Sequence, residues 1–571
     1  MRIVIAVLVL AAGHVAGESV LTYHNNNART GANTNETLLT PANVNTNTFG
    51  LLMKYEVDGY VYAQPLYFPG LVIPGHGKHN AVFVATENNS VFAFDADSQT
   101  DADRGLLWHA SLGDGIDIVT NHEFGGRYHN NVYQDMLPRV GITGTPVIDP
   151  ATGTLYLDAF TRVVTEIMTN FHHHVHALNI TNGTEQPYGP VEVVALVPGN
   201  GYGNVGGVMK FDPRQHMQRP ALTLAGGVLY VAFGSAADTD PYHGWIIGYD
   251  ASNLRLLTNH VFNTTPNATA KQFGSHAGEG ALWMGGNGLC VDANTNLYFE
   301  VANGSFSADP SLGNGGDYGD SFMKLSTTGN RLAVADFFTP FNQAEMQAQD
   351  ADFGSGGALL LPNEAGSAEH RHLIVGGDKA GKIYLVDRDN MGRYNPMNNH
   401  QIVQEFDAGA GSFFSTPVYF DHHLYYQGIR GVMKAFAISN GLITTAPTSA
   451  TKTSFGGFGT TPSVSANGSE NGIIWTIQSD GAVRHMPAIL HAYNATNLAL
   501  ELYNSSQLPV RDNPGDAVKM TVPTIADGKV FVGGQSTLAV FGNGNFLPTP
   551  MISPSDGGNF INSTTVTLAD V

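Results

Sequence analysis

The hydrophobic positions of the chain follow a repeated pattern of a short apolar run, a polar turn and a second apolar run. In the first example, Val82, Val84 and Thr86 alternate with Phe83 and Ala85 before an acidic and amide-rich turn. An alternation with period two is typical of a β-strand, and two such runs around a polar turn predict a β-hairpin.

Pairs of this kind recur on average about 64 residues apart along the chain. They start near Val82, Leu155, Leu229, Leu297, Leu373, Leu424, Ile474 and Val530. Helical periodicity is nearly absent, and only residues 342–349 favour a short helix. A single hairpin unit cannot bury both faces of its sheet. Units stacked around a ring bury these faces against their neighbours and leave few strand edges exposed. The pattern therefore predicts an all-β, eight-bladed β-propeller over residues 20–542.

The two ends of the chain depart from the repeat. Arg2, an apolar run and the small residues 15–17 are typical of a signal peptide, so residues 1–17 predict a secreted or periplasmic protein. Residues 543–550 form a turn-rich linker. Residues 551–571 resemble the opening strands of the Ig-like module at the C-terminus of chitobiase-type proteins. We expect no membrane span, because no apolar stretch is long enough.

Charge and cysteine content exclude several classes of function. The formal net charge is −21 and no basic stripe is present, which argues against a nucleic-acid partner. This acidity suits a site for a hard cation, or simply a solvated surface. Cys290 is the one cysteine, so the chain has no intrachain disulfide, no Cys-x-x-Cys-His haem attachment and no zinc site built on cysteines.

Two clusters of polar residues are candidate metal sites with simpler alternatives. His172, His174 and His176 fall on one face if the segment is a strand, and imidazoles so spaced suit zinc or copper. The alternative is a strand edge that faces solvent. The acidic loop from Asp317 to Asp320 suits calcium, or is only a turn.

Several motifs resemble one known family. They are Tyr23-His-Asn-Asn-Asn-Ala-Arg29, Leu39-Thr-Pro-Ala-Asn-Val44, Ala63-Gln-Pro-Leu66 and Gly278-Glu-Gly-Ala-Leu-Trp283. Together they resemble the opening, the first-blade motif and the G-x-G-x-x-W motif of the pyrroloquinoline quinone (PQQ) dependent alcohol and methanol dehydrogenases. The resemblance implies an eight-bladed propeller of the quinoprotein alcohol dehydrogenase type, with PQQ and calcium as cofactors. It also implies an alcohol or sugar substrate and a separate electron acceptor.

The same resemblance implies a role for four residues that occur in the family's order. Trp283 would lie under the quinone ring, as a flat aromatic platform for a planar cofactor. Asn303, in a segment similar to the family's "NLIYYGSGN", would ligate calcium through its side-chain oxygen. Asp352, in a segment similar to "TPHDEWDYAG", would be the catalytic base. Lys379 would reach the quinone oxygens.

The chain also departs from the family pattern. Tyr133 and Gln134 stand where the family often has two adjacent cysteines that form a ring disulfide. The family's glutamate ligand for calcium has no clear match, so Asp238 or Asp240 would have to serve. Arg139 and Arg219 remain as candidate partners for the carboxylates of the cofactor.

Two other functions stay open at this point. A non-catalytic propeller that serves as an extracellular binding or scaffolding module fits the missing cysteine pair and the trailing strands. A hydrolase or lyase acting on polysaccharide fits the histidine content and the predicted export.

Overall fold

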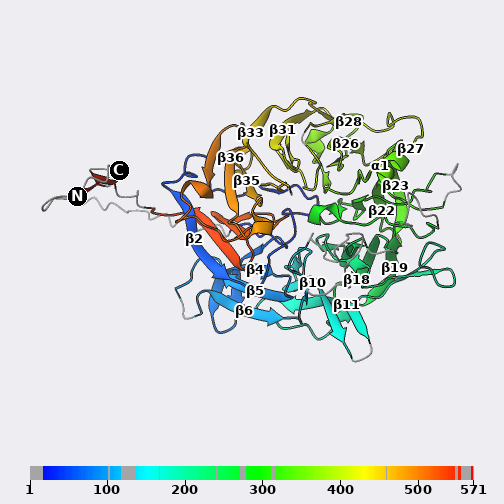
Figure 1. Cartoon of the computed structure of the whole chain (residues 1–571), viewed down its shortest axis with the longest axis horizontal. Helices are drawn as coiled ribbons and strands as arrows, with labels where there is room; N and C mark the ends of the chain where they lie inside the picture. The colour runs from blue at the N-terminus through cyan, green and yellow to red at the C-terminus, as the bar shows by residue number, and fades with distance from the viewer. Residues whose placement is uncertain are drawn as a thin grey trace, which may run out of the picture.

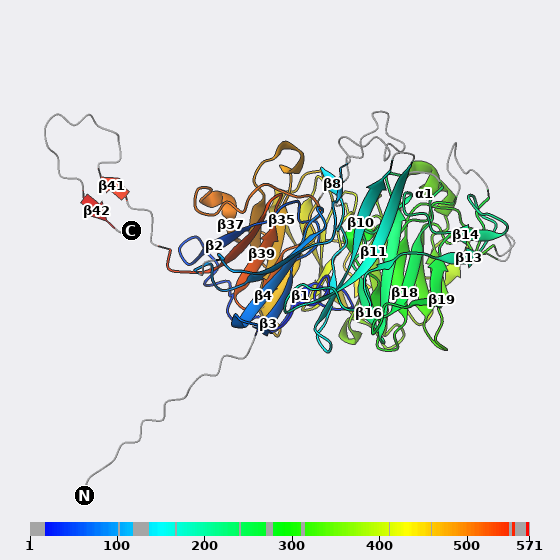
Figure 2. The same cartoon turned by 90° about the horizontal axis from the view of Figure 1, so that it is seen from below.

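Eight antiparallel sheets are arranged around one axis like the blades of a wheel (Figure 1), and the same ring is seen from the side in Figure 2. This is a computed structural model. It describes residues 17–100, 103–117, 136–165, 168–238, 241–269, 278–309, 315–409, 411–457 and 459–546, and the backbone of 551–553 and 567–569. The predicted eight-bladed β-propeller is confirmed.

The first four blades follow the chain order, with the innermost strand first. They consist of β3 (Leu66–Ile73), β4 (Gly77–Ala85), β5 (Ser90–Asp95) and β6 (Leu106–Ser111); β9 (Val147–Asp149), β10 (Thr154–Val164), β11 (Thr169–Asn179) and β12 (Val191–Glu192); β15 (His216–Met217), β16 (Thr223–Ala225), β17 (Val228–Ser235), β18 (Trp245–Asp250) and β19 (Leu256–Asn263); and β20 (Cys290–Val291), β21 (Leu297–Val301), β22 (Ser321–Ser326) and β23 (Ala333–Thr339), with β27 (Arg393–Tyr394) parallel to β23.

The last four blades have the same order, and the eighth takes its outer strand from the start of the chain. They consist of β24 (Leu359–Leu360), β25 (Leu373–Gly377), β26 (Lys382–Asp387) and β28 (Gln404–Asp407); β29 (Val418–Phe420), β30 (His423–Gln427) and β31 (Val432–Ser439) with β32 (Leu442–Ile443) and β33 (Ser449–Ser454); β34 (Ser463–Asn467), β35 (Glu470–Gln478), β36 (Ile489–Asn494) and β37 (Glu501–Asn504); and β38 (Thr524–Ala526), β39 (Lys529–Gly533), β40 (Thr537–Asn543) and β2 (Phe49–Glu56).

Strand β1 (Ala32–Asn33) pairs parallel with β34 and so adds a strand to the inner edge of the seventh blade. The other short elements are the pairs β7 (Ile116–Asp117) with β8 (Arg139–Val140) and β13 (Leu196–Pro198) with β14 (Val208–Lys210), the 3-10 turns η2 (Met284–Gly286), η4 (Asn363–Ala365), η5 (Ala482–Arg484) and η6 (Ser505–Gln507), and helix α1 (Gln343–Gln349). The eight repeat positions seen in the sequence fall in or at the start of the second strand of each blade, and the helix forms where it was predicted.

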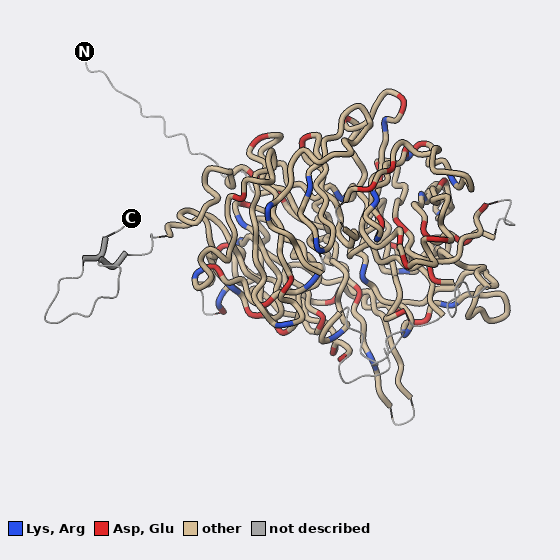
Figure 3. The backbone as a smooth tube through the Cα atoms, turned by 45° about the horizontal axis from the view of Figure 1, so that its top comes forward, with Lys and Arg blue, Asp and Glu red and all other residues tan. Residues whose placement is uncertain are grey.

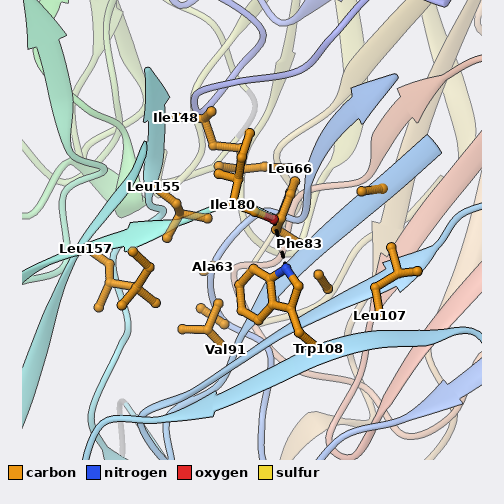
Figure 4. Packing of buried hydrophobic residues seen from close by; sticks show 14 of the residues in the cluster. Ala63, Leu66, Phe83, Val91, Leu107, Trp108, Ile148, Leu155, Leu157 and Ile180 are labelled. Atoms are coloured by element: carbon orange, nitrogen blue, oxygen red, sulfur yellow. Dashed lines mark hydrogen bonds between the residues drawn. The ribbon is translucent and has the colours of Figure 1, made fainter. Parts of the chain in front are cut away.

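The core is divided into one apolar layer between each pair of neighbouring blades. Between the first and second blades, Trp108 packs among Phe83, Leu155 and Ile180 and donates its indole N–H to the Ile180 carbonyl at 2.8 Å (Figure 4). Strands such as β5, in which every residue is buried, are therefore apolar on both faces. Because each layer needs two blades, no blade is stable by itself.

The ring is closed by the start of the chain. Strand β2 pairs antiparallel with β40, from Phe49 opposite Asn543 to Glu56 opposite Thr537. The blade that contains the last propeller strands is therefore completed by residues near the N-terminus, which leaves no open end in the ring.

A segment from residue 20 to 33, here called the N-terminal plug, follows the inner strands around the axis and hydrogen-bonds to all eight blades in order (dark blue in Figure 1). The contacts, in blade order, are Val20 with Tyr67, the Leu21 carbonyl with Ile148 N–H, Asn27 Nδ2 with the Leu224 carbonyl, the Asn27 carbonyl with Val291 N–H, the Ala28 carbonyl with Leu360 N–H, the Thr30 carbonyl with Tyr419 N–H, the Gly31 carbonyl with Val464 N–H, and Asn33 Nδ2 with the Ile525 carbonyl. The plug therefore links the inner parts of all eight blades.

Other expectations about the ends and the surface have different outcomes. The proposed signal peptide lies almost wholly outside the described residues. Strands β41 (Met551–Ser553) and β42 (Thr567–Ala569) pair antiparallel, and their assignment to an Ig-like module stays a prediction. No helix in the described residues is long and apolar enough to cross a bilayer. Basic and acidic residues are interspersed over the ring in Figure 3, with no basic stripe.

Candidate functional site

Four of the predicted site residues lie on one face of the wheel. Asn303 and Lys379 follow β21 and β25, the second strands of the fourth and fifth blades, while Trp283 and Asp352 lie in the connections that enter these two blades. In an antiparallel four-stranded blade, the connection into the first strand and the turn after the second strand emerge at the same end. The topology thus brings loops that are far apart in the sequence to one face.

Asn303, Asp350, Asp352 and Lys379 form one hydrogen-bonded group, here called the Asp352 cluster. Lys379 Nζ lies 2.8 Å from Asp350 Oδ2 and 3.0 Å from Asp352 Oδ2. The Asn303 backbone N–H donates to Asp352 Oδ1, and Asn303 Nδ2 donates to Asp350 Oδ1, both at 3.0 Å. The structure therefore brings together three residues that the sequence motifs singled out separately.

Local backbone geometry explains why these side chains meet. Asp350 ends α1 in the left-handed conformation, with φ at 56°, and turns the chain back toward the fourth blade. Two residues after Asp352, Gly354 allows a close approach to β21, since a Cβ there would lie 2.7 Å from the Ala302 nitrogen. The short helix and this glycine thus hold the Asp352 loop against the end of β21.

The electrostatics of the cluster are set by one lysine between two acids. Burial raises the pKa of Asp352, the charge of Lys379 opposes that shift, and Asp350 adds to it. Burial by itself lowers the pKa of Lys379, but Asp352 and Asp350 together raise it above its ordinary value. The ammonium also lies 6.0 Å from the centre of the Phe414 ring. The pKa of Asp352 therefore lies above its ordinary value, although Lys379 opposes the shift.

Two further acids lie behind the cluster. Asp320 is fully buried and accepts hydrogen bonds from Phe353 N–H and Gln343 Nε2, both at 3.1 Å. Burial raises the pKa of Asp320 well above its ordinary value, and the charge of Asp352 adds to the shift. Glu279 accepts a hydrogen bond from Gln347 Nε2 at 3.2 Å. Two glutamines of helix α1 therefore each donate a side-chain hydrogen bond to one of these acids.

Of the acids in and behind the cluster that have no assigned role, the sequence pointed to only one. It flagged Asp320 as one end of an acidic loop, but assigned no role to Asp350 or Glu279. The available signals were the Asp-x-Asp spacing at 350–352 and a glutamate between Gly278 and Gly280. Neither signal shows that the two acids come close to Asn303, because their segments are separated in the sequence.

Trp283 is tied to the cluster but lies in apolar surroundings. The next residue, Met284, donates its N–H to the Gly354 carbonyl at 3.0 Å. Trp283 itself packs against a buried cluster that includes Tyr62, Met217 and Val518. A cavity of about 150 Å³ on the same face is lined by Tyr60, Tyr62, Leu137, Pro138, Ala482, Val483, His485, Val518 and Lys519. Aromatic and apolar side chains therefore dominate the side of the site away from Asp352.

Arg219 and Arg139 have partners other than the Asp352 cluster. The buried Arg219 guanidinium donates to the carbonyls of Thr143 at 2.6 Å, Met520 at 3.1 Å and Gly285 at 3.4 Å. It thereby links backbone segments of several blades. Arg139 Nη1 donates to Asn88 Oδ1 at 3.0 Å. Their role toward a cofactor stays a prediction.

The remaining candidates lie elsewhere or outside the described residues. Asp238 Oδ1 accepts a hydrogen bond from Ser235 Oγ at 2.8 Å, at the end of β17. Asp240, Tyr133 and Gln134 are outside the described residues. The choice between Asp238 and Asp240 as a calcium ligand therefore stays open.

The residues of the Asp352 cluster fit a hard cation. Asn303 Oδ1 is buried and has no hydrogen-bond partner among the described residues, as a free ligand oxygen would be. The Nδ2 of the same amide donates to Asp350, and Ca²⁺ prefers carboxylate and amide oxygens. No group of three or more His, Cys, Asp or Glu residues surrounds a common point in the described part of the chain, so a cation held here would need the amide oxygen as a ligand.

Known structures share the fold of this chain. Quinohemoprotein alcohol dehydrogenases from Pseudomonas putida and Comamonas testosteroni are each 14% identical to it, with a TM-score of 0.56 over 94% of this chain and 84% and 82% of theirs. A europium-containing methanol dehydrogenase is 11% identical, with a TM-score of 0.54 over 92% of this chain and 98% of its own. No protein-family model and no curated protein matches the sequence.

These comparisons identify the class of fold. The chain is an eight-bladed β-propeller of the quinoprotein alcohol dehydrogenase type, as the sequence motifs predicted. At 11–14% identity the likeness extends to the fold alone.

Proposed function

We propose that this chain is a PQQ- and cation-dependent dehydrogenase that oxidises the hydroxyl of an alcohol or a sugar and passes electrons to a separate acceptor. The observation that carries the proposal is the contact of Asn303, Asp352 and Lys379 in one cluster, because these are the residues to which the motifs assign a ligand, a base and a cofactor contact. The predicted signal peptide is consistent with a dehydrogenase that acts in the periplasm or outside the cell.

Each residue of the cluster has a task that suits its chemistry. Asn303 Oδ1 and the neighbouring carboxylate of Asp350 would hold a cation. When bound, PQQ supplies the two-electron oxidation and the cation polarises its carbonyl. Asp352 would take the proton of the substrate hydroxyl. The charge of Lys379 favours the ionised form of Asp352, and its ammonium would donate a charged hydrogen bond to an oxygen of the cofactor.

The ion is either calcium or a lanthanide. One structure with this fold is a europium-containing methanol dehydrogenase. Asp350 and the Asn303 oxygen are hard ligands that suit either ion. Europium luminescence of the purified chain measures ion binding without any cofactor, so the cation site is testable separately from catalysis.

The decisive experiment adds PQQ to the metal-free protein with Ca²⁺ or Eu³⁺ and follows the quinone absorbance, then dye-linked oxidation of alcohols and sugars. We expect a shifted quinone spectrum and turnover. Asp352→Asn should retain the spectrum and lower kcat by about 10²–10⁴-fold, the usual contribution of general base catalysis.

A matched control is Asp389→Asn, at an exposed acid of the same blade that pairs with His372. This variant should behave as the wild type. Absence of any quinone uptake in the presence of either ion would disprove the dehydrogenase proposal.

A second candidate function is a non-catalytic extracellular binding module. The observation in its favour is that Arg219 is bound to three backbone carbonyls and Trp283 packs in an apolar cluster. In that case Asp352→Asn would leave partner binding intact, and the protein would take up no quinone.

A further inference from the structure

Strand β11, on the second blade, carries three histidines on one face, here called the histidine ladder: His172, His174 and His176. The ring centres of His172 and His174 are 5.8 Å apart, and those of His174 and His176 are 6.3 Å apart. The predicted one-sided arrangement is confirmed, because alternate residues of a strand point to the same face. The Asp352 cluster lies on the fourth and fifth blades, so the ladder is a separate feature.

Carboxylates hold the two outer imidazoles of the ladder. Glu192 Oε1 lies 2.7 Å from His172 Nδ1, and Glu185 Oε2 lies 2.7 Å from His176 Nδ1. A carboxylate on Nδ1 keeps the proton there and leaves the lone pair on Nε2. This is the arrangement by which proteins orient histidines that bind metals.

The central imidazole has no such restraint. Neither ring nitrogen of His174 has a hydrogen-bond partner among the described residues, and the side chain is half-buried. The ring of His174 is therefore available to a ligand.

We propose that His172 and His174 bind one divalent transition-metal ion, with Cu²⁺ the tightest and Zn²⁺ weaker. Two imidazoles on one ion, each at the usual metal–nitrogen distance of about 2.0–2.1 Å, have ring centres roughly 5–6 Å apart. The 5.8 Å separation of His172 and His174 falls in that range. Imidazole suits copper and zinc, and the stability order of divalent ions favours Cu²⁺.

The site is open rather than closed. No group of three or more His, Cys, Asp or Glu residues surrounds a single point within the described residues, so two imidazoles and solvent complete the coordination. His174 turns about its side-chain bonds to direct a nitrogen at the ion, while Glu192 keeps His172 in place. The open positions leave the ion accessible from solvent.

The test uses the full chain after removal of metals with a chelator. One equivalent of Cu²⁺ should give a paramagnetic resonance spectrum with coupling to two imidazole nitrogens, and calorimetry should show one site. Glu192→Gln removes a partner of a ligand and should weaken Cu²⁺ binding by roughly 10–100-fold. His174→Ala removes a ligand itself and should weaken Cu²⁺ binding by more than this.

The matched control is the double variant His370→Ala/His372→Ala. These histidines are also two positions apart, and their Nδ1 atoms lie 2.8 Å from Asp387 and 2.7 Å from Asp389. The control should bind Cu²⁺ as the wild type does. Unchanged affinity in both His174→Ala and Glu192→Gln, or loss of binding in the control, would overturn the proposal. Glu192 is exposed, so its variant tests the site even if His174→Ala folds poorly.

Discussion

At the scale of single residues, Lys379 is the group that decides the charge state of the proposed base. It lies within 3.0 Å of both Asp350 and Asp352, so its removal leaves two carboxylates together without a counter-charge. An opposite charge this close lowers a carboxyl pKa by about 1–3 units. Asp352 acts only when ionised, so activity is lost as the pH falls through its pKa.

Lys379→Gln should therefore move the acid limb of the kcat–pH profile upward by about 1–3 pH units. The control is Lys382→Gln in the same blade, where the lysine Nζ lies 3.4 Å from Glu405. This variant should leave the acid limb of the kcat–pH profile unchanged. A fall in kcat with an unmoved limb would mean that Asp352 is not the titrating base. This prediction rests on the proposed dehydrogenase activity.

The buried surroundings of Glu300 disfavour an ionised carboxylate. It is fully buried in β21, and neither carboxyl oxygen has a hydrogen-bond partner among the described residues. Burial raises the pKa of Glu300 well above its ordinary value, and the charge of Asp378 adds to the shift. The folded protein therefore binds a proton at Glu300 more tightly than the unfolded chain does.

Because the folded state binds the extra proton, stability falls as the pH rises from the ordinary glutamate pKa toward the raised one. Glu300→Gln removes this dependence, so its stability relative to the wild type should increase by up to about 1.4 kcal/mol per pH unit across that window. Thermal unfolding at a series of pH values measures this effect. The exposed Glu56→Gln should show no such trend, and equal slopes in Glu300→Gln and wild type would contradict the assignment.

At the scale of elements, the N-terminal plug connects the inner parts of the eight blades. Arg29 is fully buried in it and donates to Thr22 Oγ1, the Tyr23 carbonyl, Thr223 Oγ1 and the Leu289 carbonyl at 2.7–3.2 Å. Burial lowers the pKa of Arg29 to about 10, so it remains charged at neutral pH. One guanidinium thus satisfies acceptors from the plug and from two blades.

Arg29→Ala leaves those acceptors unpaired beside a new cavity, and should cost about 2–4 kcal/mol of stability. The apparent melting temperature is the measurement. Asn26→Ala removes two exposed hydrogen bonds to Thr30 within the plug, one donated by Asn26 Nδ2 and one accepted by Asn26 Oδ1, and should change stability by less than about 0.5 kcal/mol. Similar melting temperatures for the two variants would show that the plug is not a stabilising element.

At the scale of the whole molecule, closure of the ring by β2 and β40 makes the eight blades one cooperative unit. A chain that ends at residue 536 lacks β40 and leaves the layer between the eighth and first blades incomplete. Such a chain should lose cooperative thermal unfolding. A chain that ends at residue 546 keeps every propeller strand and should melt within a few degrees of the full chain.

Much of this whole-molecule arrangement follows from the sequence alone. The alternating runs and their regular spacing predicted eight blades, because strand periodicity and hairpin turns are local properties that the chain carries in every unit. The motifs also singled out Asn303, Asp352 and Lys379, which the structure brings into one hydrogen-bonded group. Asp350 and Glu279 were missed, because their signals are short and their partners lie in other blades.

The sequence by itself determined the all-β class, the number of blades, the short helix at 343–349 and the side of the strand on which the three ladder histidines lie. Only the tertiary structure decided that Asn303 and Asp352, 49 residues apart, share a hydrogen bond, and that Arg219 is bound by backbone carbonyls of three segments. Periodicity reports which face of an element is buried. The distance between side chains from different blades depends on how the ring closes, and no local pattern contains that information.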